Sequence, residues 1–112
     1  MTLFEKIAAR EIPARIVRET DEYLAFHDVN PQAPVHILIV PKRVIARVAE
    51  ATADDAELLG RMLVAAGDLA REVGIARSGF RIVINNGADA GESVPHLHIH
   101  LLGGRALAWP PG

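Results

Sequence analysis

The sequence predicts an α+β domain in which an antiparallel five-stranded sheet carries one long helix. Segments with the composition or period of strands precede and follow a single helical stretch, in the order strand, strand, strand, helix, strand, strand. The links between them are short, and strands joined by short links pair antiparallel. Because 112 residues is the length of one domain, residues 1–112 are expected to form a single unit.

The first elements are a short helix and a hairpin. Thr2 is placed to cap a helix, and Pro13 is expected to end it. The apolar residues of this helix recur at helical spacing: Leu3, Phe4, Ile7 and Ala8. The β-rich segments Ile16–Glu19 and Tyr23–His27 flank three polar residues, which predicts a hairpin. Two prolines in residues 30–34 then favour an irregular loop.

The middle of the chain combines a buried strand with the long helix. Val35–Pro41 is a compact apolar run rich in β-branched residues, which favours a strand. Residues 52–73 have a helical period, with a capping box formed by Thr52 and Asp55 and a C-terminal cap at Gly74. The expected apolar stripe of this helix contains Leu59, Met62, Leu63, Ala66, Leu69, Ala70 and Val73.

The last two strands contain the most informative pattern. Residues 80–85 are expected to form a strand, and residues 86–93 a loop with two glycines. Residues 95–102 alternate strictly, so three imidazoles share one face and three apolar side chains share the other. The apolar face should lie under the long helix. The face with His96, His98 and His100 is then expected to be open and to form the functional site.

Composition excludes several classes of function. Half of the residues are hydrophobic and the net charge is −2, which excludes a disordered chain and a broad basic surface for nucleic acid. No cysteine is present, so disulfides and thiolate metal sites are excluded. No apolar run approaches the length of about 18 residues needed for a membrane span, and no signal peptide is recognisable. We therefore expect a cytoplasmic protein that binds neither membranes nor nucleic acid.

The histidine row has three interpretations on its pattern alone. It can be a solvated strand face, a metal site completed by His36 or a carboxylate, or a centre for covalent catalysis at phosphorus. The third use requires a phosphate-binding segment close by. Residues 87–93 meet that requirement, because Gly87 and Gly91 allow backbone N–H groups to face an anion and Ser93 adds a hydroxyl.

The segment Ser93–Leu102 resembles the His-x-His-x-His motif of the histidine-triad (HIT) superfamily. The continuation at residues 103–105 and the ending Trp109-Pro-Pro-Gly112 are similar to its Hint branch. Similarity also covers residues 4–7, 11–14, 25–28, 31–34, 36–42 and Asn85, so it spans nearly the whole chain. The resemblance implies the HIT-like fold, with the sheet continued across a twofold homodimer.

The resemblance further implies a purine nucleoside phosphoramidase, which cleaves the P–N bond of adenosine and guanosine 5′-phosphoramidates. His98 would be the nucleophile and would form a nucleotidyl-histidine intermediate. Ser93 would help to protonate the leaving amine. The phosphate oxygens would be held by Asn85, the Gly91 backbone and His100, while His96 and His36 would orient the row. No metal or other cofactor is implied.

The resemblance also maps a nucleoside site. Asp28 would accept two ribose hydroxyls, and the base would lie among Phe4, Ile7, Phe26 and Val29. Trp109 belongs to a tail that, in the Hint branch, reaches the active site of the partner subunit. The partners implied are therefore a purine nucleoside monophosphate or phosphoramidate and a second copy of the chain.

Two other functions remain open at this level. One is a dinucleoside polyphosphate hydrolase of the Fhit type, which uses the same histidine chemistry on a P–O bond. The other is a noncatalytic nucleotide- or zinc-binding regulator. The chain also departs from common Hint residues at Glu92, Pro95 and Ala108, which bears on the choice of leaving group.

Overall fold

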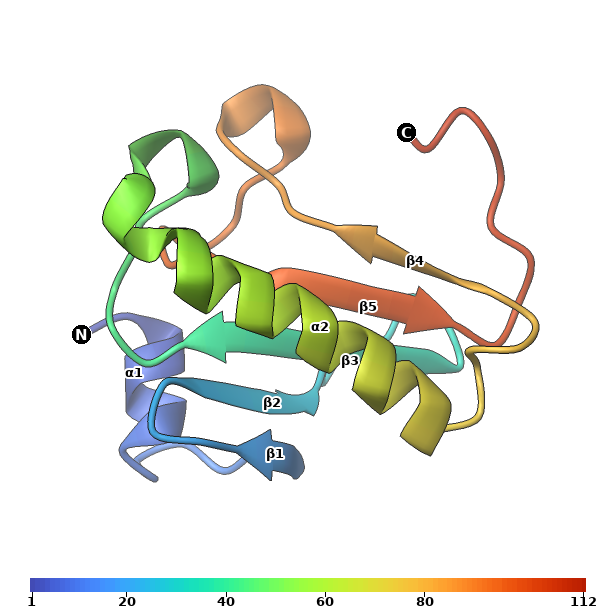
Figure 1. The fold of residues 1–112 in the computed structure, drawn as a ribbon, viewed down its shortest axis with the longest axis horizontal. Coiled ribbons are helices and arrows are strands. Elements are labelled where there is room, and N and C mark those ends of the chain that lie inside the picture. Colours follow the sequence, from blue (N-terminus) through green and yellow to red (C-terminus); the bar gives the residue numbers. More distant parts are fainter.

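The computed structural model describes residues 1–112 and confirms the predicted α+β class. Five strands form one antiparallel sheet in the order β1-β2-β3-β5-β4, and α2 crosses one face of it (Figure 1). The elements are α1 (Leu3–Ala8), β1 (Ile16–Glu19), β2 (Tyr23–His27), β3 (Val35–Pro41), α2 (Ala56–Glu72), β4 (Phe80–Val83) and β5 (Ile99–Gly103).

The main core lies between the sheet and α2. It contains fifteen buried residues, among them Ile37 and Ile39 of β3 and Ile99 and Leu101 of β5. Each of these four residues is fully buried. Removal of so much apolar surface from water supplies the main driving force for folding. It also makes β3 and β5 a rigid base for the residues on their opposite faces.

Helix α1 begins as predicted but ends earlier than Pro13. Thr2 and Glu5 form a capping box at its start. At its end, Arg10 adopts a left-handed conformation with φ of 64°, and the Glu11 N–H bonds to the Lys6 carbonyl. This is the hydrogen-bond pattern of a Schellman motif, which normally uses glycine. The expected role of Pro13 is therefore wrong, because the helix ends at Ala8.

Helix α2 is shorter than the predicted range 52–73. The capping box of Thr52 and Asp55 is present, but it begins a 3₁₀ turn at Ala53–Asp55 that leads into the α-helix. Gly74 ends the helix with φ of 82°, as expected. The apolar stripe is rotated from the predicted one, because Leu63 is 44% exposed. The buried residues are Leu58, Met62, Ala65, Ala66, Leu69 and Ala70.

The two final strands are also shorter than predicted. Strand β4 ends at Val83 rather than residue 85, and β5 begins at Ile99 rather than residue 95. Before β5, the backbone leaves the ladder, since the Leu97 N–H bonds to the Ile45 carbonyl outside the sheet. The predicted division of faces nevertheless holds, because Leu97 joins the core under α2.

The sequence led us to expect that the opposite face of the sheet is open. The structure shows that it is covered. Helix α1 covers part of it and forms a second core of six buried residues. These are Phe4, Ile7, Leu24, Phe26, Leu38 and Val40. His96 and His98 are themselves buried there. Helix α1 buries the apolar side chains that β2 and β3 present on this face. None of the helices combines the length and the apolar composition that a membrane span requires.

Candidate active site

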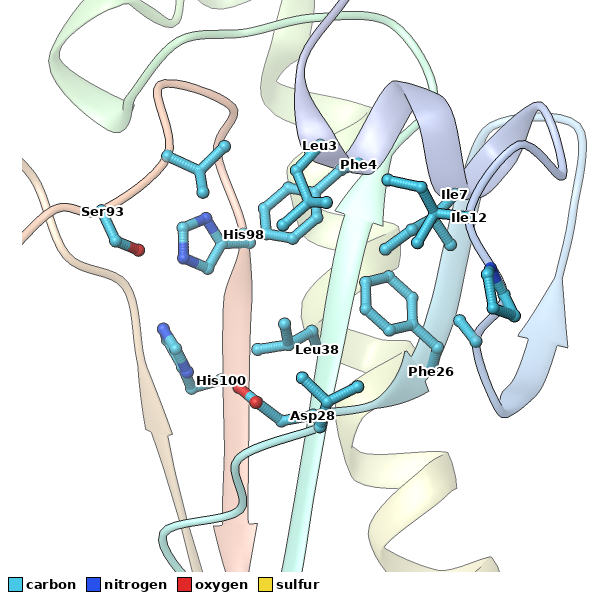
Figure 2. A pocket seen from close by; sticks show the side chains of 14 residues that line it. Leu3, Phe4, Ile7, Ile12, Phe26, Asp28, Leu38, Ser93, His98 and His100 are labelled. Carbon is cyan, nitrogen blue, oxygen red and sulfur yellow. The ribbon is translucent and has the colours of Figure 1, made fainter.

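A cavity of about 260 Å³ lies between α1, the sheet and the loop before β5. Most of its fourteen lining residues are hydrophobic, but His98, His100, Ser93 and Asp28 are grouped around one side. Figure 2 shows His98, His100 and Ser93 beside one another, with Phe26 and Ile12 across the cavity. The apolar lining comprises Leu3, Phe4, Ile7, Ile12, Pro13, Ala14, Phe26, Val29, Leu38 and Val94. The site therefore joins an apolar chamber to a small polar cluster.

The hydrogen bonds of His98 leave one ring nitrogen as a free base. Its Nδ1 lies 2.8 Å from the His96 carbonyl oxygen, which can only accept, so Nδ1 carries the proton in the neutral ring. Nε2 then has an available lone pair and no protein partner. The ring packs edge-on against Phe4, with centroids 4.9 Å apart. Backbone and aromatic contacts thus hold His98 in one tautomer and one orientation, as a nucleophile or base requires.

A chain of hydrogen bonds assigns the proton of His100. The Gln32 N–H donates to Nδ1 of His36, so the proton of neutral His36 lies on Nε2. That Nε2–H donates to Nδ1 of His100 over 2.9 Å, which places the His100 proton on its own Nε2. This last N–H is buried and lacks a partner in the protein. A buried donor without a partner is costly, and an anionic oxygen in the cavity would satisfy it.

Burial keeps the His36 and His100 imidazoles neutral. It lowers the pKa of His100 to about 4, and His98 and His36 add to that effect by electrostatic repulsion. Burial also lowers the pKa of His36, although the nearby Asp28 carboxylate opposes the shift. At neutral pH, His100 is therefore an uncharged hydrogen-bond donor. Its Nε2–H can bind a phosphate oxygen without requiring a buried cation.

His96 links the row to the N-terminal helix. Its Nε2 donates to the Pro41 carbonyl over 2.7 Å, so the Thr2 hydroxyl donates to Nδ1, also over 2.7 Å. The same Thr2 oxygen accepts the Glu5 N–H in the helix cap. Burial lowers the pKa of His96, which is fully enclosed. His96 therefore does not line the cavity. It contacts two residues that do, because its carbonyl binds His98 and its ring packs on Phe4.

The lowered histidine pKa values predict a loss of stability in mild acid. The folded-state pKa of His36, His96 and His100 lies below the unfolded value of about 6.5, so the unfolded chain binds more protons as pH falls. Their contribution is complete above pH 6.5 and is lost as pH falls toward the folded pKa. Each such proton changes the free energy of unfolding by up to about 1.4 kcal/mol per pH unit.

Urea unfolding at pH 7.5, 6.5, 5.5 and 5.0 measures this effect before most carboxylates titrate. We expect the free energy of unfolding to decrease steadily below pH 6.5. Burial also lowers the pKa of His27, so four histidines contribute to the decrease. The His100→Phe variant should show a smaller decrease, since one of these four groups is removed. Equal stability at pH 7.5 and 5.0 would contradict the assignment of neutral buried histidines.

The loop before β5 places Ser93 at the cavity and offers backbone donors beside it. The Ser93 hydroxyl has no hydrogen bond in the protein and faces the two imidazoles (Figure 2). The N–H groups of Ser93 and Val94 are also free of backbone partners. The Gly91 N–H, by contrast, donates to the Ala88 carbonyl, and Gly91 does not line the cavity. Sequence reasoning missed the Val94 amide, because no side chain marks it.

The remaining predicted residues divide into two groups. Phe4, Ile7, Phe26 and Asp28 line the cavity, as does Val29, whose side chain is 92% exposed at the rim. Asn85 follows β4 and does not line the cavity, but its amide makes no hydrogen bond in the protein. Trp109 is 81% exposed and lies outside the cavity, over the Arg81 guanidinium. Within one chain, the structure does not bring Trp109 to the site.

Three side chains of this cluster have the types and spacing of a metal site. Asp28, His36 and His100 offer ligand atoms within 4.8 Å of one another. A metal bound between the two rings would need lone pairs on His36 Nε2 and His100 Nδ1. The Gln32 N–H opposes this arrangement, because its donation to Nδ1 leaves the His36 proton on Nε2. The residues therefore fit a histidine–histidine hydrogen bond better than a metal ion.

The fold and cavity define a class of α+β protein whose site combines an imidazole with one ring nitrogen free of protein partners, anion donors and an apolar chamber. The profile of the HIT domain family matches residues 9–107, and the chain belongs to that family. It is 55% identical to an uncharacterised HIT-like protein of Synechocystis, over 99% of this chain and 96% of the relative.

Solved structures agree with this assignment. A HIT family hydrolase from Legionella pneumophila superimposes with a TM-score of 0.97 and 48% identity, over the full length of both chains. A HIT family hydrolase from Clostridium thermocellum gives a TM-score of 0.92 and 44% identity, over 96% of this chain and 93% of that one. These neighbours support a hydrolase.

Proposed function

We propose that this protein is a purine nucleoside phosphoramidase of the Hint type. It hydrolyses the P–N bond of adenosine, and also guanosine, 5′-phosphoramidates through a nucleotidyl-His98 intermediate. The observation that carries the proposal is the free Nε2 of His98 in a cavity that also holds the unpartnered Nε2–H of His100. A nucleophile and an anion donor on one wall suit attack on phosphorus.

In the first step, the His98 Nε2 lone pair attacks the α-phosphorus and the P–N bond breaks. The leaving amine takes up the proton of the Ser93 hydroxyl, which regains a proton from solvent water. The His98 ring becomes positively charged, and its Nδ1–H bond to the His96 carbonyl stabilises that charge. Water then attacks phosphorus, and the bond between phosphorus and His98 Nε2 breaks. The attacking water loses a proton to the solvent, which balances the proton used in the first step, and the nucleoside monophosphate leaves with the lone pair of His98 Nε2 restored.

The phosphate and nucleoside have complementary surroundings. His100 Nε2–H and the free amides of Ser93 and Val94 would donate to phosphate oxygens, with Asn85 as a further donor. The Gly91 backbone would shape this segment, since its own N–H is used within the loop. The base would lie between Phe4, Ile7 and Phe26, with Val29 at the rim, and the ribose beside Asp28.

The direct test is turnover of an adenosine 5′-phosphoramidate that carries a fluorescent amine, measured with EDTA present. We expect metal-independent release of the amine and of AMP in equal amounts. Rapid acid quenching followed by mass spectrometry should detect the nucleotide on the peptide that contains His98. An inert protein that binds zinc or nucleotide tightly would refute the proposal and favour a regulatory ligand site.

Replacement of Asp28 by asparagine tests the ribose site. Asparagine keeps an acceptor oxygen for the Asn30 N–H but loses the charge that favours two ribose hydroxyls. We expect KM to rise about tenfold, with kcat changed less than threefold, because uniform binding is lost. A 2′,3′-dideoxy substrate should show little difference between Asp28→Asn and the wild type. An unchanged KM for the ribonucleoside substrate would refute this role.

The proposed assembly is a homodimer in which the sheets of two chains become continuous. The sheet ends at β1 and β4 within one chain, and the exposed tail with Trp109 contacts Arg81 of β4. In the dimer, Trp109 would approach the cavity of the other chain. Sedimentation equilibrium at micromolar concentration should give twice the mass of the chain, and a single-chain mass would contradict the assembly.

A further inference from the structure

Residues 86–97, here called the triad loop, carry Ser93, Val94 and His96 but belong to no strand. Only one short 3₁₀ turn, Ala88–Ala90, occurs within them. A segment of twelve residues with two glycines at positive φ has little intrinsic rigidity. A phosphate site built on this loop therefore depends on what holds the loop in place.

His96 attaches the end of the triad loop to Thr2 and Pro41, and three further attachments come from residues 45–49, which follow β3. The Ala49 N–H donates to the Asn86 side-chain oxygen over 2.8 Å at the start of the loop. The Leu97 N–H donates to the Ile45 carbonyl over 2.7 Å at its end. Between them, the Arg47 guanidinium binds the Glu92 carboxylate. Figure 1 shows these two segments side by side above the sheet.

The central attachment is a fork-shaped ion pair. Arg47 Nε lies 2.9 Å from Glu92 Oε1, and Arg47 Nη2 lies 3.1 Å from Oε2. The Gly87 N–H also donates to Oε1, over 3.0 Å. The Glu92 carboxylate is only 12% exposed. Arg47, followed by the Gly87 N–H, holds the pKa of Glu92 below its usual range, so the ion pair persists at neutral and mildly acidic pH.

Glu92 is the residue immediately before Ser93. Its side chain closes the turn onto Gly87, and its own N–H bonds to the Gly87 carbonyl over 3.1 Å. Arg47 fixes this closed turn to the rest of the domain. Loss of the guanidinium would free the turn and leave the largely buried Glu92 carboxylate without its cation near the proposed phosphate position. Both effects would weaken an anion site formed by Ser93 and Val94.

We propose that Arg47 and Glu92 are positioning residues, which hold the triad loop so that the Ser93 hydroxyl and the Ser93 and Val94 amides meet the phosphate of the substrate. The reaction that this positioning serves rests on the proposed function. The anion site itself can be tested without turnover, because inorganic phosphate and AMP bind the same donors.

A second arginine–glutamate pair provides a matched control. Arg61 binds Glu22 with Nε and Nη2 at 2.8 and 2.7 Å, also in a fork. This pair joins α2 to the β1–β2 turn, and neither residue lines the cavity of about 260 Å³. Arg61→Met therefore removes the same chemical interaction away from the site.

The experiment compares Arg47→Met, Glu92→Ala, Glu92→Gln, the double variant Arg47→Met/Glu92→Ala, and Arg61→Met. Nitrogen-15 order parameters report the rigidity of residues 87–94, calorimetry gives the AMP and phosphate dissociation constants, and steady-state assays give kcat and KM. Thermal denaturation identifies the fraction that is folded. Phosphoramidate turnover is expressed per folded protein.

For Arg47→Met we expect lower order parameters in the triad loop, weaker binding of AMP and phosphate, and kcat/KM reduced about 10- to 100-fold. Glu92→Gln should retain more activity than Glu92→Ala, because its amide oxygen can still accept the Gly87 N–H. Arg47 also binds the Glu50 carboxylate, but Glu50 lies outside the triad loop. The double variant should therefore lose no more site function than the more impaired single variant, since the Arg47–Glu92 pair is the contact through which both residues act on the loop. Arg61→Met should change none of these site properties.

Arg47→Met with loop rigidity, phosphate affinity and kcat/KM within twofold of Arg61→Met would overturn the positioning role. A wild type that does not cleave phosphoramidates, but whose phosphate affinity and loop rigidity fall in Arg47→Met, would refute the proposed function and support the positioning pair. The two proposals therefore fail in different measurements.

Discussion

Replacement of His98 by alanine is expected to lower kcat/KM for the adenosine phosphoramidate by about 10⁴-fold or more. The cavity contains three other ionisable or hydroxyl-bearing side chains, but each has another role. His100 presents an N–H rather than a lone pair, Ser93 is an unactivated hydroxyl, and Asp28 is assigned to the proposed ribose site. No neighbour can therefore replace the Nε2 lone pair as nucleophile.

His27→Ala is the matched control for His98→Ala. His27 is another histidine on the same sheet, in β2, and it does not line the cavity of about 260 Å³. The His27→Ala variant should retain turnover within about threefold of the wild type. His98→Ala and His98→Gly should both lose turnover and still bind AMP. Retention of more than a few per cent of wild-type kcat by His98→Ala, with adduct formation unchanged, would move the nucleophile to another residue.

The parts of the fold that the sequence predicted are those governed by local rules. The hairpin strands Ile16–Glu19 and Tyr23–His27 and the strand Val35–Pro41 are present with the predicted bounds. Their β-branched or aromatic residues and the flanking turn residues favour strands at these positions. The end of α1 was missed because Arg10 adopts a left-handed conformation that usually requires glycine.

Tertiary contacts explain the larger differences. The segment before Ile99 alternates as a strand does, yet Leu97 bonds to Ile45 instead of to a neighbouring strand. The histidine face was expected to be open, but the pattern of β5 alone cannot reveal that α1 folds over it. Phe4 closes that face and packs on both His96 and His98.

The candidate site was predictable in its side chains and less so in its hydrogen bonds. The alternation of three imidazoles placed His98 and His100 on one face, and the structure puts both in the cavity. The backbone donors were not visible, because any residue can supply an N–H. Gln32 is the clearest case, since its amide, and not its side chain, determines the proton positions on His36 and His100.

The second large effect is expected for His100→Phe. Phenylalanine has a similar shape but lacks the Nε2–H that faces the cavity. Loss of one preorganised donor to a developing phosphate charge should reduce kcat about 10²- to 10³-fold, with a smaller change in KM. The pKa of about 4 means that His100 is neutral at pH 7, so the variant removes a hydrogen bond and not a charge.

The His36→Leu variant tests the tautomer of His100. It keeps the His100 ring but removes the His36 Nε2–H that fixes the position of its proton. Without His36 Nε2–H, the proton of His100 can occupy either nitrogen, so only part of the molecules present Nε2–H to the phosphate. We therefore expect kcat to fall less for His36→Leu than for His100→Phe, with little change from His27→Phe as the control for loss of an imidazole. Steady-state assays at pH 7.5 on the three variants test this order. A His100→Phe enzyme with kcat within threefold of His27→Phe would contradict it, because the buried N–H would then have no part in stabilising the phosphate.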